Sequence, residues 1–354
     1  MRILFVGEGW RGSSARALRD ALTRRSDVEL ADIDVDRFTP PASGLPARLW
    51  SRLAWPLRAR ILRRAVVGAT GAFAPDCILI YKGGPFSARF LTRLKRRGRP
   101  VVNILPDCSP QAHGQTLAKA MGAYDLVIST KPFHPAAWRS TYGYANRCVF
   151  VAHGYDPAVH LRDAPPERFD FDVAIVASGR PEYHELMRGL AAQPGSHGLK
   201  VLICGPGWTR LRSRLPGSWV LTGGGYGDAY GAAIRAARIV LSPVQRHIRA
   251  KGQAQPGDED STRSYEIPAA FGFMIHRRTP FIASVYDPDT EVPLYDGPED
   301  LARLIHHYLA RDDRRRAMAA AAHARAVPAY AVDSRAAEIV THLTAAIATA
   351  REGA

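Results

Sequence analysis

The sequence lacks any long uninterrupted apolar run and holds few cysteines. No stretch of about 18 uncharged apolar residues occurs, which argues against a transmembrane helix. The four cysteines, Cys77, Cys108, Cys148 and Cys204, are far apart and none forms a C-x-x-C pair. A structural zinc site is therefore not expected, and free cysteines in apolar segments fit a reducing cytoplasm. The N-terminus passes directly into an apolar strand, so we expect no secretory signal and a cytoplasmic protein.

Acidic residues are outnumbered by basic ones. The chain has 33 Asp and Glu against 48 Lys and Arg, a formal net charge of +15. Such an excess attracts phosphate-rich partners, including nucleotides, nucleic acid and anionic lipid. Nucleic-acid binding usually needs basic residues interleaved with aromatic ones on one surface, whereas these arginines are spread along the chain. We therefore expect no nucleic-acid partner, and a basic nucleic-acid- or membrane-binding protein is the non-enzyme alternative.

Short apolar segments alternate with helical patterns along the whole chain of 354 residues. This alternation predicts α/β domains with doubly wound parallel sheets, and the length suits two of them. A segment rich in proline and charge, residues 161–170, reads as a linker, after which the strand pattern restarts. We expect an N-terminal domain over 1–160, a C-terminal domain over 171–330, and a C-terminal helix over 331–354 that packs back on the first domain. The expected strands of the first half are Arg2–Val6, Val28–Ile33, Cys77–Tyr81, Val101–Leu105, Leu126–Ser129 and Cys148–Val151, and those of the second half are FDVAIVAS, KVLICG, WVLT, ARIVLS and GFMIH.

The first turn, GEGWRG at residues 7–12, spells the G-x-G-x-x-G pattern of dinucleotide-binding proteins. It follows an apolar strand and precedes a helical pattern, and Asp34 stands near the position of the ribose-binding acid. An NAD(P)-dependent oxidoreductase is therefore an alternative function. Trp10 and Arg11 argue against it, because large side chains crowd the place where a pyrophosphate would lie.

A segment with dense arginines, residues 45–67, reads as a basic amphipathic helix. Its apolar positions are Leu49, Trp50, Leu53, Leu57 and Ile61, and its arginines are Arg48, Arg52, Arg58, Arg60, Arg63 and Arg64. The favoured hypothesis is a surface helix that packs its apolar stripe on the sheet and turns its arginines outward. A second hypothesis is peripheral contact with an anionic membrane.

Loops at the carboxyl ends of the strands are the candidate binding sites. The most informative is DEDSTRSYEIPAAFG at residues 258–272, where Asp260 or Ser261 would cap a helix. An arginine in the first turn of a helix can hold a diphosphate, and a glutamate one turn on can accept hydrogen bonds from sugar hydroxyls. On spacing alone, a plain surface ion pair between Arg263 and Glu266 explains the pattern equally well.

The segment STRSYEIPAAFGFMIHRRTP, with the downstream EVPLYDGPEDLARLIHHYLARDDRRRAMAAAAHARAV and YAVDSRAAEI, resembles the C-terminal half of the CgeB-like (spore-protein) glycosyltransferases. KGGPF, LPDCSP, AYDLVIST, HGYDPAVH and FDVAIVASGRPEYHELMRGL are similar to upstream parts of that bacterial family. The resemblance implies a GT-B fold, in which two Rossmann-like domains face a cleft and the second holds most of the nucleotide-sugar donor. It implies a hexosyltransferase-like enzyme acting on an unidentified acceptor.

The resemblance also assigns roles to residues. The expected donor-binding residues are Arg263, Ser264, Glu266, Ser178, Gly179, Arg180, Gly205 and Trp208. The expected acceptor or cleft residues are Gly9, Trp10, Arg11, Lys82 and His153. The candidates for the general base are Asp107, then Glu8, then His113.

Two positions depart from the family's pattern. Many GT-B enzymes carry a second acid eight positions after the first, where this chain has Met274. Relatives carry an acid after the following strand, where this chain has Arg277 and Arg278. The usual carboxylate for the ribose diol is thus not evident. No D-x-D motif stands in a fitting place, so we expect a metal-independent enzyme with a nucleotide-diphosphate sugar as co-substrate and no cofactor.

Overall fold

The computed structural model describes residues 1–38, 45–95, 99–112, 114–250 and 253–352. The chain divides into two compact units. Unit 1 comprises Met1–Ala152 and Val332–Ala354, and unit 2 comprises His153–Ala331. The chain thus enters unit 2 earlier than residue 160, because Tyr155 pairs with Ala331 in a parallel bridge within that unit.

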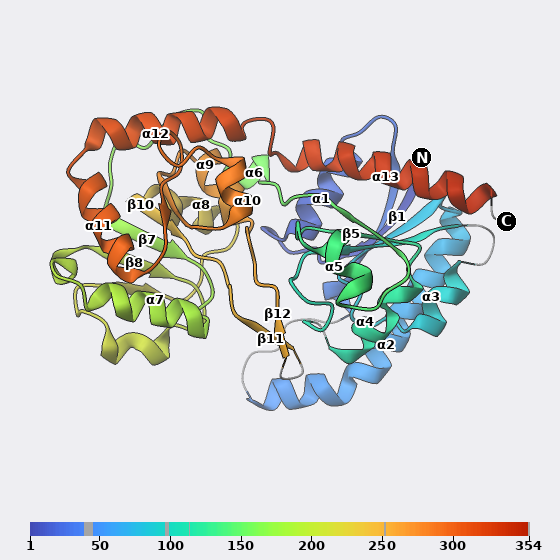
Figure 1. Cartoon of the computed structure of the whole chain (residues 1–354). Coiled ribbons are helices and arrows are strands. Elements are labelled where there is room, and N and C mark those ends of the chain that lie inside the picture. The colour runs from blue at the N-terminus through green and yellow to red at the C-terminus, as the bar shows by residue number, and fades with distance from the viewer. Residues whose placement is uncertain (39–44, 96–98, 113, 251–252, 353–354) are drawn as a thin grey trace. The chain divides into compact units, whose positions relative to one another are not determined.

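Unit 1 is built on a six-stranded parallel sheet with the order β2-β1-β3-β4-β5-β6 (Figure 1). Its strands are β1 (Arg2–Gly7), β2 (Glu29–Asp34), β3 (Cys77–Tyr81), β4 (Val101–Leu105), β5 (Leu126–Ser129) and β6 (Arg147–Phe150). Its helices are α1 (Ser14–Thr23), α2 (Leu45–Phe73), α3 (Ala88–Leu94), α4 (Gln115–Ala120), α5 (His134–Ser140) and α13 (Val332–Glu352), with 3-10 turns η1 (Val35–Arg37) and η2 (Met121–Ala123). The central strands are wholly apolar and buried on both faces, as parallel strands covered by helices must be.

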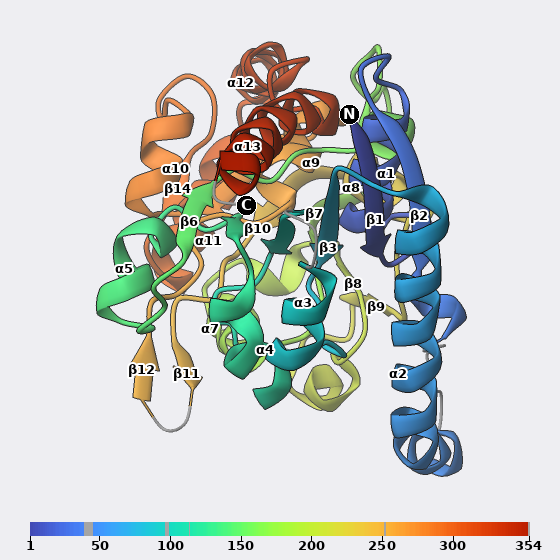
Figure 2. The same cartoon turned by 90° about the vertical axis from the view of Figure 1, so that its right-hand side faces the viewer.

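Helices cover both faces of this sheet. On one face α1 and α13 pack together, with Leu22, Ile339 and Leu343 in one apolar cluster. On the other face α2 and α3 contribute Leu62, Val66 and other side chains to a second cluster. Figure 2 shows α2 standing beside β1 and β2, with its first turns projecting past the strands. α2 is one helix of 29 residues that continues through Pro56.

Unit 2 also has a six-stranded parallel sheet, with the order β14-β13-β10-β7-β8-β9. Its strands are β7 (Phe171–Val176), β8 (Val201–Cys204), β9 (Val220–Thr222), β10 (Ala237–Ser242), β13 (Met274–Arg277) and β14 (Leu294–Tyr295), and β11 (Ile248–Ala250) pairs with β12 (Gln253–Gln255) in a separate antiparallel hairpin. Its helices are α6 (Pro157–His160), α7 (Pro181–Ala191), α8 (Asp228–Arg235), α9 (Arg263–Ala269), α10 (Pro280–Val285), α11 (Pro298–Leu309) and α12 (Asp312–Ala326), with 3-10 turns η3 (Ser196–Gly198) and η4 (Thr209–Arg214). The doubly wound α/β prediction is confirmed for both units.

Two local predictions need correction. The apolar stripe of the segment 45–67 does not pack on the sheet, because Trp50, Leu53, Leu57 and Ile61 are exposed. The N-cap of α9 is Thr262, in helical geometry and without a side-chain capping bond, in place of Asp260 or Ser261.

Candidate functional site

Each sheet has one switch point, a position where the strand order reverses and two neighbouring strands are not consecutive in the chain. In unit 1 it lies between β1 and β3, and in unit 2 between β7 and β10. Ligands of open α/β sheets bind outside the carboxyl ends of the strands at this switch point. Each unit therefore has a candidate site of its own at its switch point.

The glycine-rich turn after β1 is held by acidic side chains of its own unit. The backbone amides of Gly9 and Trp10 both donate to the Asp36 carboxylate, the first at 3.0 Å. A Cβ added at Gly9 would lie 2.5 Å from Cγ of Asp34, so a side chain there would have to displace the Asp34 carboxylate. Burial and the carboxylates of Asp34 and Glu8 raise the pKa of Asp36. A pyrophosphate here would find the amides already bonded and three carboxylates around it, which argues against the dinucleotide hypothesis.

The turn after β3 has a backbone conformation that is costly for a side chain. Lys82 adopts a left-handed φ of 63° and Gly83 follows with a φ of 88°. The buried side chain of Asn103 donates to the Lys82 carbonyl at 2.9 Å and holds the turn. The Lys82 ammonium then reaches back to Glu8, with Nζ 2.6 Å from Oε1. Strain of this kind persists where the surrounding structure fixes it, often at functional sites.

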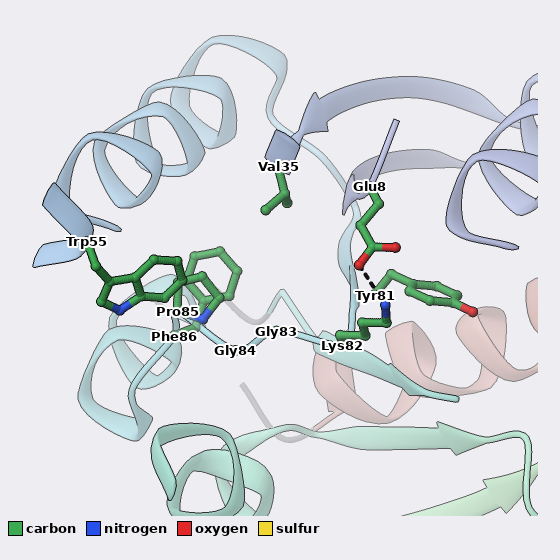
Figure 3. Close-up of a pocket in the computed structure, with 9 residues that line it drawn as sticks. All are labelled: Glu8, Val35, Trp55, Tyr81, Lys82, Gly83, Gly84, Pro85 and Phe86. Atoms are coloured by element: carbon green, nitrogen blue, oxygen red, sulfur yellow. Dashed lines mark hydrogen bonds and ion pairs between the residues drawn. The ribbon is translucent and has the colours of Figure 1, made fainter. Parts of the chain in front are cut away.

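These two turns open onto a pocket in unit 1 with a volume of about 240 Å³. Figure 3 shows the Glu8–Lys82 pair at one end and the rings of Trp55 and Phe86 at the other. Its full lining is Glu8, Val35, Trp55, Tyr81, Lys82, Gly83, Gly84, Pro85 and Phe86. One end can hydrogen-bond a hydroxyl and the other can pack against an apolar or sugar face, the usual composition of a small-molecule site.

Asp107 and Glu8 come from two different turns, and both carboxylates lie near the Tyr81 hydroxyl. Burial raises the pKa of Tyr81, and the nearby carboxylates of Asp107 and Glu8 raise it further. Glu8 lines the pocket and Asp107 does not. Trp10 and Arg11 are exposed on the same turn as Glu8, and His113 lies outside the described residues.

The switch point of unit 2 is organised around a cation. The Arg263 guanidinium, in the first turn of α9, donates through Nη2 to the carbonyl of Pro243 after β10, at 2.8 Å. Its Nε is buried without a partner among the described residues. Burial opposes its charge, but the hydroxyls of Tyr183 and Tyr230 and the carboxylate of Glu266 more than compensate and raise the pKa of Arg263. The side chain is therefore a permanent positive charge with hydrogen-bonding capacity to spare.

Glu266 lies one turn further along α9 and is nearly buried. The Tyr230 hydroxyl of α8 donates to Oε2 at 2.7 Å, and burial with the Glu266 charge raises the pKa of Tyr230, which keeps that proton in place. The Asp156 amide donates to Nδ1 of His160, so the proton of this imidazole is on Nε2, 3.7 Å from Oε1 of Glu266. Tyr230 and His160 were missed by the sequence analysis, because 36 residues separate Tyr230 from Glu266 and no motif links them.

The remaining predicted donor residues divide into core and surface. The Ser264 hydroxyl is buried and lies 2.8 Å from Nε2 of His276, so it faces the interior. The amides of Ser264, Tyr265 and Glu266 already donate to the carbonyls of Ser261 and Thr262. The group that α9 offers an anion is therefore the Arg263 guanidinium.

The turns after β7 and β8 interlock. The Gly179 amide donates to the Pro206 carbonyl at 2.7 Å, and a Cβ at Gly205 would overlap the Ala177 carbonyl oxygen. The sequence predicts Trp208 beside a nucleotide, but its indole is only 2% exposed and donates to the Ala177 carbonyl.

Unit 2 holds three further predicted residues and one glutamate that fixes a loop. Ser178 and Arg180 are exposed on the turn after β7, and Arg180 donates to Gln245 at 3.0 Å. Glu182 accepts from the amides of Arg246 and His247 and fixes the loop after β10. His153 is buried at the start of unit 2.

The chain is similar to known glycosyltransferases in sequence over part of its length and in fold. A family model described as glycosyl transferase-like matches residues 180–341, the stretch that contains Arg263 and Glu266. The match covers a stretch in the C-terminal part of the chain. No curated protein sequence matches it significantly.

Solved structures of glycosyltransferases are similar to this chain over nearly its whole length. HepE of Anabaena, solved with UDP and glucose, is 16% identical with a TM-score of 0.64, over 98% of this chain and 100% of that one. Sucrose-phosphate synthase of Thermosynechococcus elongatus is 14% identical with a TM-score of 0.67, over 99% and 100%. AviGT4, a glycosyltransferase of avilamycin A biosynthesis, is 15% identical with a TM-score of 0.61, over 99% and 98%. The fold is therefore GT-B, as expected.

Proposed function

We propose that this protein is a glycosyltransferase that takes its sugar from a nucleotide-diphosphate sugar, with the donor on unit 2. The observation that carries the proposal is the first turn of α9, where Arg263 and Glu266 stand one turn apart at the switch point of the sheet. They lie within the stretch that matches the glycosyl transferase-like model. The cation suits a diphosphate and the carboxylate suits sugar hydroxyls.

In the reaction, the bond between the anomeric carbon and the diphosphate oxygen breaks, and an acceptor oxygen bonds to that carbon. Negative charge grows on the leaving diphosphate. The Arg263 guanidinium would stabilise it as it forms, and preorganised charge of this kind is usually the largest catalytic contribution. We propose that this cation, without a metal ion, neutralises the leaving group.

Unit 1 would supply the acceptor half. An acceptor hydroxyl placed at the polar end of the unit 1 pocket would lie beside Glu8, with the rest of the acceptor against Trp55. Glu8 is our first candidate for the group that takes the proton of that hydroxyl, and Asp107, which the sequence ranks first, is the second.

Two finer assignments belong to the proposal. The motif R-S-Y-E-I-P-A at residues 263–269, with the upstream KGGPF, supports a CgeB-like subgroup. HepE has been solved with UDP-glucose, which supports a uridine-diphosphate hexose as the first donor to try.

A thermal-shift panel tests the function. UDP, GDP, TDP, NAD and NADP would each be added at increasing concentration to the full chain. A ligand at 100 times its Kd stabilises by about 2.7 kcal/mol, or about 5–10 °C in the Tm of a unit of this size. We expect a shift with a nucleoside diphosphate and none with NAD or NADP. A shift confined to NAD or NADP would establish the oxidoreductase alternative instead.

A further inference from the structure

Most of the large apolar side chains that are exposed among the described residues belong to α2. Nine large hydrophobic side chains are exposed among the described residues, and six of them belong to α2: Trp50, Leu53, Trp55, Leu57, Ile61 and Val67. Scattered exposed apolar residues are ordinary, but a contiguous set on one element marks an interaction site.

Four of these residues form one stripe along the helix. Trp50, Leu53, Leu57 and Ile61 are spaced three, four and four positions apart, which places them on one face. They are 67%, 75%, 62% and 44% exposed. We call these four residues the outer stripe. Leu62 and Val66, by contrast, lie in the buried cluster against the sheet. α2 therefore has a second apolar face that the fold of unit 1 does not use.

The charges around the outer stripe have one sign. Arg60 and Arg64 are exposed and Arg58 is half-buried on the same turns. The sequence holds no acidic residue between Asp36 and Asp76, so no carboxylate of this segment balances them. Apolar side chains flanked by arginines are the composition of helices that lie in the headgroup region of anionic bilayers.

We propose that the outer stripe docks this protein on an anionic lipid membrane, with α2 lying in the plane of the surface. Leu53, Leu57 and Ile61 would enter the acyl boundary, Trp50 would lie at the headgroup level, and the arginines would contact lipid phosphates. No helix among the described residues has the length and apolar run needed to cross a bilayer, so this contact is with one leaflet.

A second copy of the chain is a poorer occupant for the same face. A two-fold contact would bring the stripe of one molecule against the stripe of another and set arginines opposite arginines. Like charges in such a contact are repelled, whereas phosphates of an anionic leaflet neutralise them. The charge complementarity thus selects the membrane.

Docking through the outer stripe would also bring the unit 1 pocket close to the membrane. Trp55, which lines that pocket, lies on the opposite side of α2 from the outer stripe, and a helix is about 10 Å thick. The pocket would then lie close to the headgroups. Resting on the proposed function, this geometry favours an acceptor carried by a lipid or displayed at the membrane.

Vesicle flotation of the full chain tests the docking without any activity readout. Vesicles of phosphatidylcholine alone would be compared with vesicles that also contain the anionic lipid phosphatidylglycerol. We expect flotation with anionic vesicles at low salt, and release at high salt. The triple variant Leu53→Ser, Leu57→Ser, Ile61→Ser should abolish it. Arg58, Arg60 and Arg64 changed to Gln should weaken partitioning about a hundredfold.

A matched control removes the same number of charges elsewhere. Arg303, Arg311 and Arg314, all exposed on or beside α11 and α12, changed to Gln should float like the wild type. Arg63 is left intact, because it donates to the Pro85 carbonyl of the pocket loop. Quenching of tryptophan fluorescence by brominated lipid should fall in Trp50→Phe.

Three results would overturn the proposal. The first is wild-type protein that stays out of anionic vesicles at low salt. The second is loss of flotation in the control variant equal to that of the α2 arginine variant, which would show a general charge effect. The third is a dimer in light scattering that the triple serine variant dissolves, which would make a second copy the occupant of the stripe.

Discussion

The two switch points of this molecule share a topology and differ in charge. In unit 1 the carboxylates of Glu8, Asp34 and Asp36 lie around the first glycine-rich turn. The Asp36 carboxylate accepts hydrogen bonds from two backbone amides of that turn. In unit 2 the comparable place is governed by the Arg263 guanidinium. A glycine motif therefore says how closely two backbones approach, whereas the side chains around it decide which ligand the site attracts. By that criterion we expect the diphosphate of the proposed donor on unit 2.

The largest effect is expected from the acceptor half. Glu8→Gln should lower turnover by about 10²–10⁴-fold, because the carboxylate that accepts the proton is lost. Nucleoside-diphosphate affinity, measured by calorimetry, should not change, because that site is on unit 2. The matched control is Glu29→Gln, an exposed glutamate of unit 1.

Asp107→Asn separates the two candidates for the base. If it loses turnover while Glu8→Gln keeps it, the base is Asp107 and the ranking given by the sequence was the better one. If neither variant loses turnover with a working acceptor, unit 1 contributes no base.

Changes at Arg263, in the proposed donor site of unit 2, should lower nucleoside-diphosphate affinity. Arg263→Ala should weaken nucleoside-diphosphate binding by about a hundredfold, roughly 3 kcal/mol, because the phosphates lose a buried cation. Arg263→Lys should recover part of the affinity, since it restores the charge without the planar fork. Arg238→Ala, an exposed arginine of unit 2, is the control. Equal affinity in all three variants, measured by calorimetry, would remove Arg263 from the site.

Acid should weaken unit 2 through one buried histidine. Burial lowers the pKa of His276 to about 4, so the unfolded chain binds its proton from about pH 6.5 downward while the folded chain resists it. Stability is therefore highest above pH 6.5 and falls as the pH falls, by about 3 kcal/mol between pH 7 and pH 4 from this group.

The variant His276→Gln should lack this contribution to the pH dependence of stability. At pH 7 it should be less stable than the wild type. Denaturant unfolding across this pH range measures it. The control is the exposed His197→Gln, whose slope should match that of the wild type. An unchanged slope in His276→Gln would show that other groups carry the acid sensitivity.

The smallest of these effects concerns the interlocked turns of unit 2. Gly205→Ala should cost about 2 kcal/mol, because Gly205 has a φ of 142° and its Cβ would overlap the Ala177 carbonyl. Gly198→Ala is a matched control, with open space around its Cβ. Thermal unfolding compares the two, and equal Tm values would mean that the turns can separate without cost.

The sequence was sufficient for most of the fold. Strands such as Cys77–Tyr81 and Val101–Leu105 are continuous apolar runs between helical patterns, and their bounds were predicted correctly. The strand Leu294–Tyr295 was missed because two residues are too few to show a strand pattern. The β11–β12 hairpin was missed because its segment is polar.

The site was predicted less completely than the fold. The proximity of Arg263 and Glu266 could be predicted because they share one helical turn. The contacts of Tyr230 and His160 with Glu266 could not, because they form only when distant segments meet. Glu8 and Lys82 were each predicted as site residues, but their ion pair was not, because 74 residues separate them. The direction of the α2 stripe was predicted wrongly: the favoured hypothesis packed it on the sheet, because helical spacing does not distinguish an inner from an outer face, whereas the structure exposes it.

The central claim, that the donor diphosphate binds unit 2 and not the glycine-rich turn of unit 1, is tested most directly by hydrogen–deuterium exchange with and without saturating UDP. The account predicts slower exchange in peptides that cover residues 178–183, 243–247 and 261–266, with no change in the peptide that covers residues 7–13. Protection confined to residues 7–13 would contradict it, because the diphosphate would then lie on the turn that Asp34 and Asp36 surround.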